Sequence, residues 1–145
     1  MSDHDLHRFL DAQEGVYAQA LAELRAGRKR SHWMWFIFPQ FDGLGVSPTS
    51  RRYAIRSLDE ARAYLRHPIL GRRLAECTEA VNDHDGLTAR QVFGPPDDRK
   101  LRSSMTLFEL VSGPASPFAA ALEKYYAGER DARTIELVRL APEGG

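Results

Sequence analysis

Apolar side chains recur at helical spacing over the first part of the chain. Between residues 6 and 24 they return every three or four positions, and Gln13 is the one polar residue on this stripe. That period is expected of an amphipathic α-helix with one buried face. Asp3 or Asp5 is placed to cap its start, and Gly27 to end it. The pattern therefore predicts one long helix over 6–24.

The most apolar stretch follows after a short basic link. Residues 33–38 are six consecutive large apolar residues and include both tryptophans of the protein. Periodicity alone does not decide between a buried strand and a short buried helix for such a run. An isolated strand is unstable without neighbours, and no second strand pattern is evident elsewhere. With Ser31 as a cap and Pro39 as a terminator, we favour a short helix.

The segment after the apolar run has the composition of a loop. Residues 41–50 contain two glycines and a proline, which are typical of turns and loops. Loops on a rigid scaffold often carry binding residues. Segment 41–50 is therefore expected to be an irregular connection and a natural place for a site.

Cap and stop signals divide the rest of the chain into further helices. Capping-box patterns open at Ser57 and at Thr88. Pro68 suits the first position of a helix, and proline next to Asp or Ser marks two later starts at 96–97 and 116–117. Glycines follow most of the apolar stripes. The predicted helices cover about 57–65, 68–86, 88–94, 97–113, 117–128 and 131–140.

These elements predict an all-α fold, a compact single-domain bundle of about six or seven helices over residues 1–145. The chain has the usual length of one domain and shows no internal repeat or linker. Hydrophobic residues make up 43% and charged residues 28%, which is a globular composition and not a disordered one. We expect residues 1–4 and 141–145 to be flexible ends.

Charge and cysteine content exclude several classes of function. Lys+Arg and Asp+Glu are both 20, so the formal net charge is zero. Dedicated nucleic-acid binders usually carry a basic excess, so we do not expect nucleic acid as the partner. Cys77 is the single cysteine, which excludes an intrachain disulfide and a multi-cysteine zinc site. It lies on an apolar helix stripe and is expected in the core.

Neither a metal site nor membrane insertion is expected. His4, His7, His67 and His84 do not have metal-ligand spacing, and no motif points to a cofactor. The longest apolar run is six residues, far below the ~20 that span a bilayer. The acidic, polar start is unlike a secretory signal. We therefore expect a cytoplasmic protein without a metal or cofactor; the oligomeric state stays open.

The first candidate site flanks the apolar run. The imidazole of His32 is a candidate acid or base, and Trp33 or Trp35 could stack on a ring of a ligand. Gln40 could orient a polar group, and the cations at 28–30 could attract an anion. The alternative is that both tryptophans fill the core, with His32 at its rim and Gln40 in a turn.

The second candidate site is the start of the helix predicted over 97–113. Lys100, Arg102, Ser103 and Ser104 lie within its first two turns. Cations oppose the usual preference for acidic residues at this end of a helix, and a bound phosphate or carboxylate would resolve the conflict. The alternative is that Asp97 and its acidic neighbour satisfy the helix start and pair with the bases.

The two blocks resemble a known family. Arg-Lys-Arg-Ser-His-Trp-Met-Trp-Phe-Ile-Phe-Pro-Gln at 28–40 and Lys-Leu-Arg-Ser-Ser-Met-Thr-Leu-Phe at 100–108, with Ser-Leu-Asp-Glu-Ala-Arg-Ala-Tyr-Leu at 57–65, are similar to a bacterial family of unknown function often labelled "calpastatin". The resemblance implies a small, stand-alone, mainly helical cytoplasmic protein without an established activity. The inhibitor called calpastatin is disordered and repetitive, so we do not expect calpain inhibition. A more distant similarity is to the ADP-ribose-associated N-glycosidase superfamily, which implies only a ligand class.

Two functions are compatible with these patterns. The first is an enzyme or binder of a phosphate-bearing small molecule, such as a nucleotide or an ADP-ribose derivative, with His32 and Lys100 lining one cleft. The second is a non-catalytic protein-interaction module that uses an exposed patch of residues 33–41. Whether the protein is an enzyme is left open by the sequence.

Overall fold

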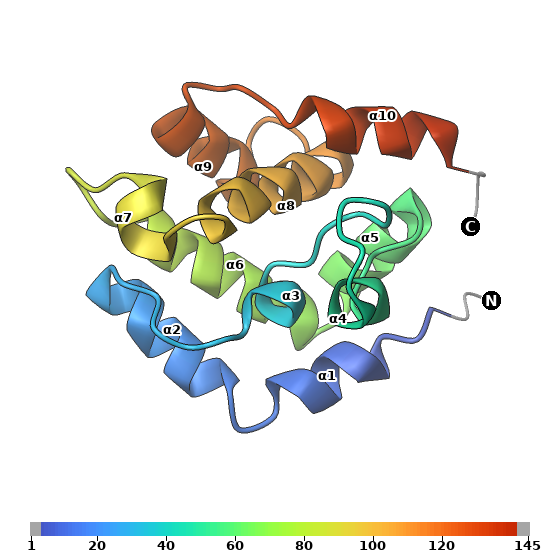
Figure 1. Ribbon diagram of the computed structural model, residues 1–145, viewed down its shortest axis with the longest axis horizontal. Coiled ribbons are helices and arrows are strands. Elements are labelled where there is room, and N and C mark those ends of the chain that lie inside the picture. The colour runs from blue at the N-terminus through green and yellow to red at the C-terminus, as the bar shows by residue number, and fades with distance from the viewer. Residues whose placement is uncertain (1–3, 142–145) are drawn as a thin grey trace.

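Figure 1 shows the computed structural model, which describes residues 4–141. Within this range every regular element is a helix and no strand forms, as predicted for an all-α fold. Ten helices are present in the described residues, more than the predicted six or seven. They are α1 (His7–Gln13), α2 (Tyr17–Ala26), α3 (Met34–Ile37), α4 (Pro48–Arg52), α5 (Leu58–Arg66), α6 (Leu70–Asn82), α7 (Ala89–Phe93), α8 (Asp97–Ser112), α9 (Pro117–Tyr126) and α10 (Ala132–Leu140).

The long helix predicted over 6–24 is wrong, because the chain turns between α1 and α2. Gly15 adopts a left-handed φ of 75°, which glycine reaches without the steric cost of a side chain. The apolar period continues across this turn, so periodicity alone conceals it. Asp5 does not cap α1, whose N-cap is Leu6 without a side-chain hydrogen bond, and Asp3 lies outside the described residues. Gly27 ends α2 in the left-handed conformation, as predicted.

The segment around the apolar run contains two short helices. Helix α3 confirms the helical interpretation of residues 33–38, although its N-cap is Trp33 and not Ser31. Helix α4 lies within the segment predicted to be a loop. The Ser47 hydroxyl accepts a hydrogen bond from the Ser50 N–H and Pro48 occupies the first turn, which is an ordinary helix start.

Most of the other predicted helix starts are confirmed. The side chains of Ser57, Thr88, Ser116 and Asp131 each accept a hydrogen bond from a backbone N–H in the first turn. The start predicted at Pro68 is two residues too early, because α6 begins at Leu70. The predicted ends at 1–4 and 141–145 fall, apart from His4 and Ala141, outside the described residues.

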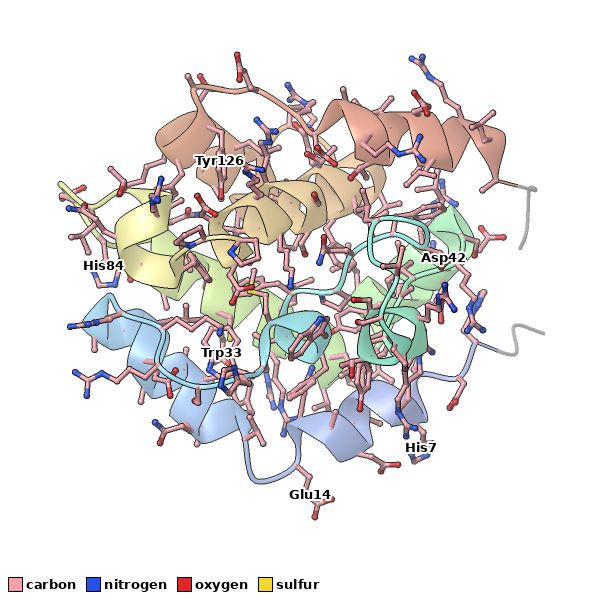
Figure 2. All side chains as sticks on the ribbon, in the orientation of Figure 1. His7, Glu14, Trp33, Asp42, His84 and Tyr126 are labelled. Atoms are coloured by element: carbon pink, nitrogen blue, oxygen red, sulfur yellow. The ribbon has the colours of Figure 1, made fainter. Side chains whose placement is uncertain are left out.

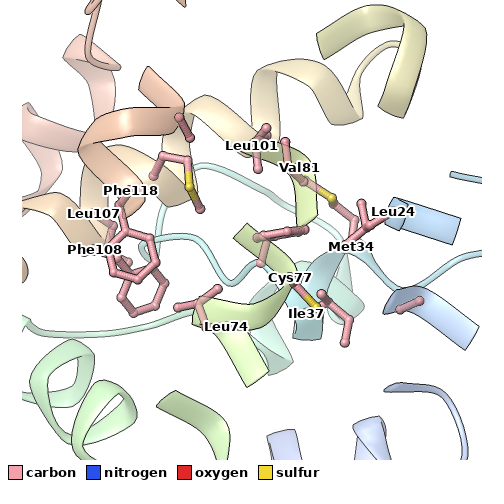
Figure 3. Packing of buried hydrophobic residues seen from close by; sticks show 14 of the residues in the cluster. Leu24, Met34, Ile37, Leu74, Cys77, Val81, Leu101, Leu107, Phe108 and Phe118 are labelled. Atoms are coloured by element: carbon pink, nitrogen blue, oxygen red, sulfur yellow. The ribbon is translucent and has the colours of Figure 1, made fainter. Parts of the chain in front are cut away.

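The core is enclosed by the helices that pack around α6 and α8 (Figures 1 and 3). Helix α8 contacts α5, α7, α9 and α10, while α6 contacts α2, α5 and α9. Phe9, Tyr64 and Phe108 form a line of contacting rings through this core, with centroids 5.1 and 5.5 Å apart. Phe108 continues the line to Phe118 at 5.7 Å. Cys77 is buried in the same cluster, as expected.

None of the helices in the described part of the chain has both the length and the apolar character needed to cross a membrane. Nor do residues 4–141 contain a group of three or more His, Cys, Asp or Glu side chains arranged to hold a metal ion.

Candidate functional site

The two cation-rich segments of the sequence meet at Asp97. Lys29 Nζ lies 2.9 Å from Asp97 Oδ2, and Lys100 Nζ lies 3.5 Å from Oδ1 of the same carboxylate. The pairing that the sequence offered as the alternative to an anion site is therefore present. Two ammonium groups share one carboxylate, however, so this group of three side chains retains a net positive charge.

Each of these lysines also lies over a tryptophan ring. Lys29 Nζ is 5.0 Å from the ring centroid of Trp33, and Lys100 Nζ is 5.1 Å from that of Trp35. An ammonium group at this distance from an indole face is attracted by the π electrons. The contacts join the segment before α3 to the first turn of α8.

The two tryptophans differ in exposure. Trp33 has no exposed surface, and its Nε1 donates a hydrogen bond of 3.0 Å to Glu23 Oε1. Figure 2 shows it between α2 and α3. Trp35 is half-buried. Of the two rings, only that of Trp35 reaches the surface where a ligand could stack on it.

Trp35 and Gln40 line a small cavity together with the loop before α4. Its volume is about 20 Å³, enough for a single water molecule. Gly45 permits the close packing here, because a Cβ at this position would lie 2.5 Å from Ser50 Cβ. Two of the predicted site residues are thus brought together. The cavity is lined by Trp35, Gln40, Phe41, Gly43, Gly45, Ser50, Tyr53 and Ala54.

A buried carboxylate holds the polar segment that leads into this site. Glu23 on α2 is 4% exposed and accepts hydrogen bonds from the backbone N–H groups of Arg30 and Ser31, the Ser31 hydroxyl, Gln19 and Trp33. Burial by itself raises the pKa of a carboxyl group, but these donors stabilise the charged form and lower the pKa of Glu23 to about 2. Sequence analysis missed Glu23, because a glutamate in a helix is normally exposed.

Arg102 and Ser103, which belong to the second predicted site, lie away from Asp97 and contact Asp131. Arg102 Nη2 lies 3.9 Å from Asp131 Oδ1, and the Ser103 hydroxyl donates a hydrogen bond of 3.1 Å to Asp131 Oδ2. Both residues therefore contact the start of α10. Residues two apart on a helix point in different directions, which separates Arg102 from Lys100. Ser104 is buried, and its hydroxyl has no hydrogen-bond partner within residues 4–141.

His32 is exposed and lies outside the cavity lining. Within the described residues, its ring makes no hydrogen bond or ion pair. Acid–base catalysis requires a side chain held within hydrogen-bond reach of the proton that it transfers. Neither His32 nor Lys100 lines the Trp35 cavity, so a cleft common to both residues stays a prediction.

Several lining residues were not predicted individually. Ser50 and Tyr53 belong to α4 and its C-cap, in a segment where a loop was expected. The signal for the region was nevertheless present, because the glycines of segment 41–50 marked it as a candidate binding loop. Tyr53 carried no such signal, since a tyrosine can pack in a core as well as line a site.

The chain is similar to a known protein family and to a solved crystal structure. A family model described as "Protein of unknown function (DUF1810)" matches residues 3–138. The crystal structure of the conserved hypothetical protein Rv1873 from Mycobacterium tuberculosis is similar to this chain at 54% identity with a TM-score of 0.93. The similarity covers 97% of this chain and 100% of that one. A search of curated proteins finds no match.

Proposed function

The chain belongs to the DUF1810 family of proteins of unknown function, and we propose that it binds a phosphate-bearing small molecule. The ligand class is a nucleotide or an ADP-ribose derivative, whose ring would stack on Trp35 and whose phosphate would bind the ammonium group of Lys100. Neither matching description names calpastatin or the ADP-ribose-associated N-glycosidase superfamily, so both resemblances remain predictions.

One observation carries the proposal: Lys100 Nζ lies 5.1 Å from the ring centroid of Trp35, and Trp35 lines the cavity. The ring offers a face for stacking, and the ammonium group offers a donor for a phosphate oxygen. Lys29 adds a second cation, and their shared carboxylate neutralises only one of the two.

Binding requires the cavity to open. At about 20 Å³ it is far smaller than a typical ligand pocket. The loop before α4 lines the cavity through Phe41, Gly43 and Gly45, and Gly43 has a left-handed φ of 103°. A hinge in this loop would uncover the Trp35 ring together with Gln40 and the Ser50 hydroxyl.

The proposal is restricted to binding. Within residues 4–141 no hydrogen bond or ion pair orients the His32 ring, and His32 does not line the cavity, so we assign no chemical step to it. We further propose a cytoplasmic location, because the single thiol, Cys77, is buried and unpaired and disulfide-free chains are typical of that compartment.

Burial favours this proposal over the interaction module. Trp33, Met34, Ile37, Phe38 and Phe41 are each at most 4% exposed. Interfaces between proteins need a substantial exposed area with a hydrophobic centre. The stretch 33–41 contributes too little surface for such a patch in this conformation.

Thermal unfolding across a nucleotide panel tests the proposal. The compounds to compare are inorganic phosphate, AMP, ADP, ADP-ribose and NAD. A ligand present at 100 times its Kd stabilises the native state by about 2.7 kcal/mol. For a chain of this size, that corresponds to a rise in Tm of about 5–10 °C. The Lys100→Ala variant should lose most of this rise.

Lys124→Ala is the matched control. Lys124 is on α9 and pairs with Asp85, away from the Trp35 cavity, so its removal should leave the ligand-induced rise unchanged. If no compound raises Tm, or if Lys100→Ala and Lys124→Ala respond equally, the proposed site is wrong.

A further inference from the structure

Three arginines from different elements converge on one surface groove. Arg8 of α1, Arg52 of α4 and Arg56 of the connection to α5 line a hollow of about 280 Å³, with Asp5 as the fourth lining residue. Figure 1 shows the start of α1 beneath α4. A net charge of zero for the whole chain makes this local concentration of cations notable, because it is not part of a general basic excess.

Arg8 forms a fixed wall of this groove. Its side chain is 9% exposed, and its Nη2 lies 3.0 Å from Oε2 of the buried Glu60. Arg8 also donates to the backbone carbonyls of Arg52, Ala54 and Asp5. Four of its five guanidinium N–H groups are therefore used, which leaves one on Nη1 without a partner in the described residues.

The same contacts fix the backbone that carries the other two arginines. The carbonyl of Arg52 accepts from Arg8 Nε at 2.7 Å. The N–H of Arg56 donates to Glu60 Oε1 at 2.8 Å. Arg8 and Glu60 thus act as a buried brace that holds Arg52 and Arg56 on neighbouring sides of the groove.

Arg52 and Arg56 are exposed residues, and neither forms an ion pair with any residue in 4–141. The guanidinium group of Arg52 lies over the Tyr53 ring, with Cζ 5.7 Å from the ring centroid. Glu60 is already paired with Arg8, and Asp5 supplies one negative charge at the rim. The three arginines and the two carboxylates leave the groove with one positive charge in excess. Like charges held together in this way repel one another, and a bound anion relieves the repulsion.

We propose that this groove is a binding site for a phosphate-type oxyanion. A guanidinium group presents two parallel N–H donors to two oxygens of a phosphate, which a single ammonium group does not. Arg52 and Arg56 supply these forks, and the free N–H of Arg8 supplies a donor at the wall. The groove and the Trp35 cavity share no lining residue, so this site is separate from the proposed small-molecule site.

The test is a titration followed by the backbone amide NMR signals of the full chain, with inorganic phosphate and inorganic pyrophosphate as probes. Saturable shifts are expected at residues 5, 8, 52 and 56, which line the groove and not the Trp35 cavity. Loss of a charge-assisted hydrogen bond weakens binding roughly ten- to hundredfold, so Arg52→Gln with Arg56→Gln should raise Kd at least tenfold. Asp5→Asn should lower Kd several-fold, because it removes a negative charge from the rim.

Arg62→Gln is the matched control, since Arg62 is an exposed arginine of α5 paired with Asp59; it should leave Kd unchanged. Lys100→Ala should also leave Kd unchanged, which separates this site from the proposed function. Equal weakening by Arg62→Gln, or the absence of saturable shifts, overturns the proposal. A short oligonucleotide that shifts these signals when neither phosphate does so would identify a nucleic-acid contact and would also overturn it.

Discussion

Glu23 organises the polar segment that leads into the aromatic run. Its two carboxylate oxygens accept from donors on Gln19, Arg30, Ser31 and Trp33. Such a carboxylate is held in its charged form by hydrogen bonds and not by a neighbouring cation. Glu23 therefore links the end of α2 to the core tryptophan, and its charge state should affect the stability of the whole region.

We expect Glu23 to contribute to acid unfolding. Its folded pKa of about 2 is below the ordinary 4.5, so its contribution is complete above pH 4.5 and is lost as pH falls toward 2. This shift corresponds to about 3 kcal/mol. Glu23→Gln should lower the free energy of unfolding at pH 7 by about 2–3 kcal/mol, and should flatten its decline between pH 4.5 and 2, as measured by urea unfolding.

Glu14→Gln provides the comparison for that measurement. Glu14 is exposed and points into solvent (Figure 2), and surface substitutions usually change stability by less than about 0.5 kcal/mol. Equal effects of the two substitutions would contradict the role given to Glu23.

Gln13 shows what a sequence pattern could and could not indicate at this scale. It was recognisable as a polar interruption of an apolar stripe, which predicts that it faces the core. Its partners were not recognisable, because they come from distant parts of the chain. Gln13 Nε2 donates to the Phe36 carbonyl at 2.7 Å, and its Oε1 accepts from Arg73 at 3.1 Å.

Helix ends were predictable where a local rule determines them. Ser57, Thr88, Ser116 and Asp131 are capping residues that act on amides within the next turn, so sequence spacing is sufficient. Breaks that depend on backbone conformation were not predictable. Apolar spacing is the same whether Gly15 continues a helix or turns the chain, and only tertiary packing decides between the two.

The close approach of α5 and α6 gives a prediction at the scale of elements. A Cβ added at Gly71 would lie 2.0 Å from the backbone carbonyl oxygen of Leu65. Alanine favours helices over glycine by about 1 kcal/mol, so propensity alone predicts that Gly71→Ala stabilises α6. We expect the opposite, a loss of about 3 kcal/mol, because the backbone must move. Chemical denaturation measures the sign directly.

Gly86→Ala is the control for this substitution. Gly86 has a φ of 81°, and no atom lies within 4 Å of an added Cβ. Its cost should be limited to about 1 kcal/mol of left-handed backbone strain. If Gly71→Ala is no more destabilising than Gly86→Ala, the contact between α5 and α6 is looser than described.

For the whole molecule, the continuous core predicts a single unfolding transition. Rings from α1, α5, α8 and α9 form one connected line through Phe9, Tyr64, Phe108 and Phe118. Domains below about 150 residues with one core usually unfold in two states. Far-UV and near-UV circular dichroism should therefore give the same Tm. Phe108→Ala should lower the free energy of unfolding by about 3–5 kcal/mol and should lower the Tm from both signals equally.

Separate far-UV and near-UV transitions would contradict the prediction of one domain over the whole chain.

The all-α class was predictable because helical periods and caps recur along the chain. The grouping of charges was not, since Lys29 and Lys100 meet only through Asp97, and Arg8 meets Arg52 only after folding. Long-range contacts of this kind leave no spacing signal in the sequence.

The unequal surroundings of the two tryptophans make them a pair of optical reporters. Trp33 is fully buried in the core, and its indole N–H donates a hydrogen bond to Glu23. The ring of Trp35, in contrast, contacts the Lys100 ammonium group, and Trp35 lines a cavity. Fluorescence from Trp33 accordingly follows the integrity of the fold, and that from Trp35 follows events at the surface. Quenching by a dissolved small molecule reaches the second indole and not the first, so one unlabelled sample distinguishes occupancy of the site from unfolding.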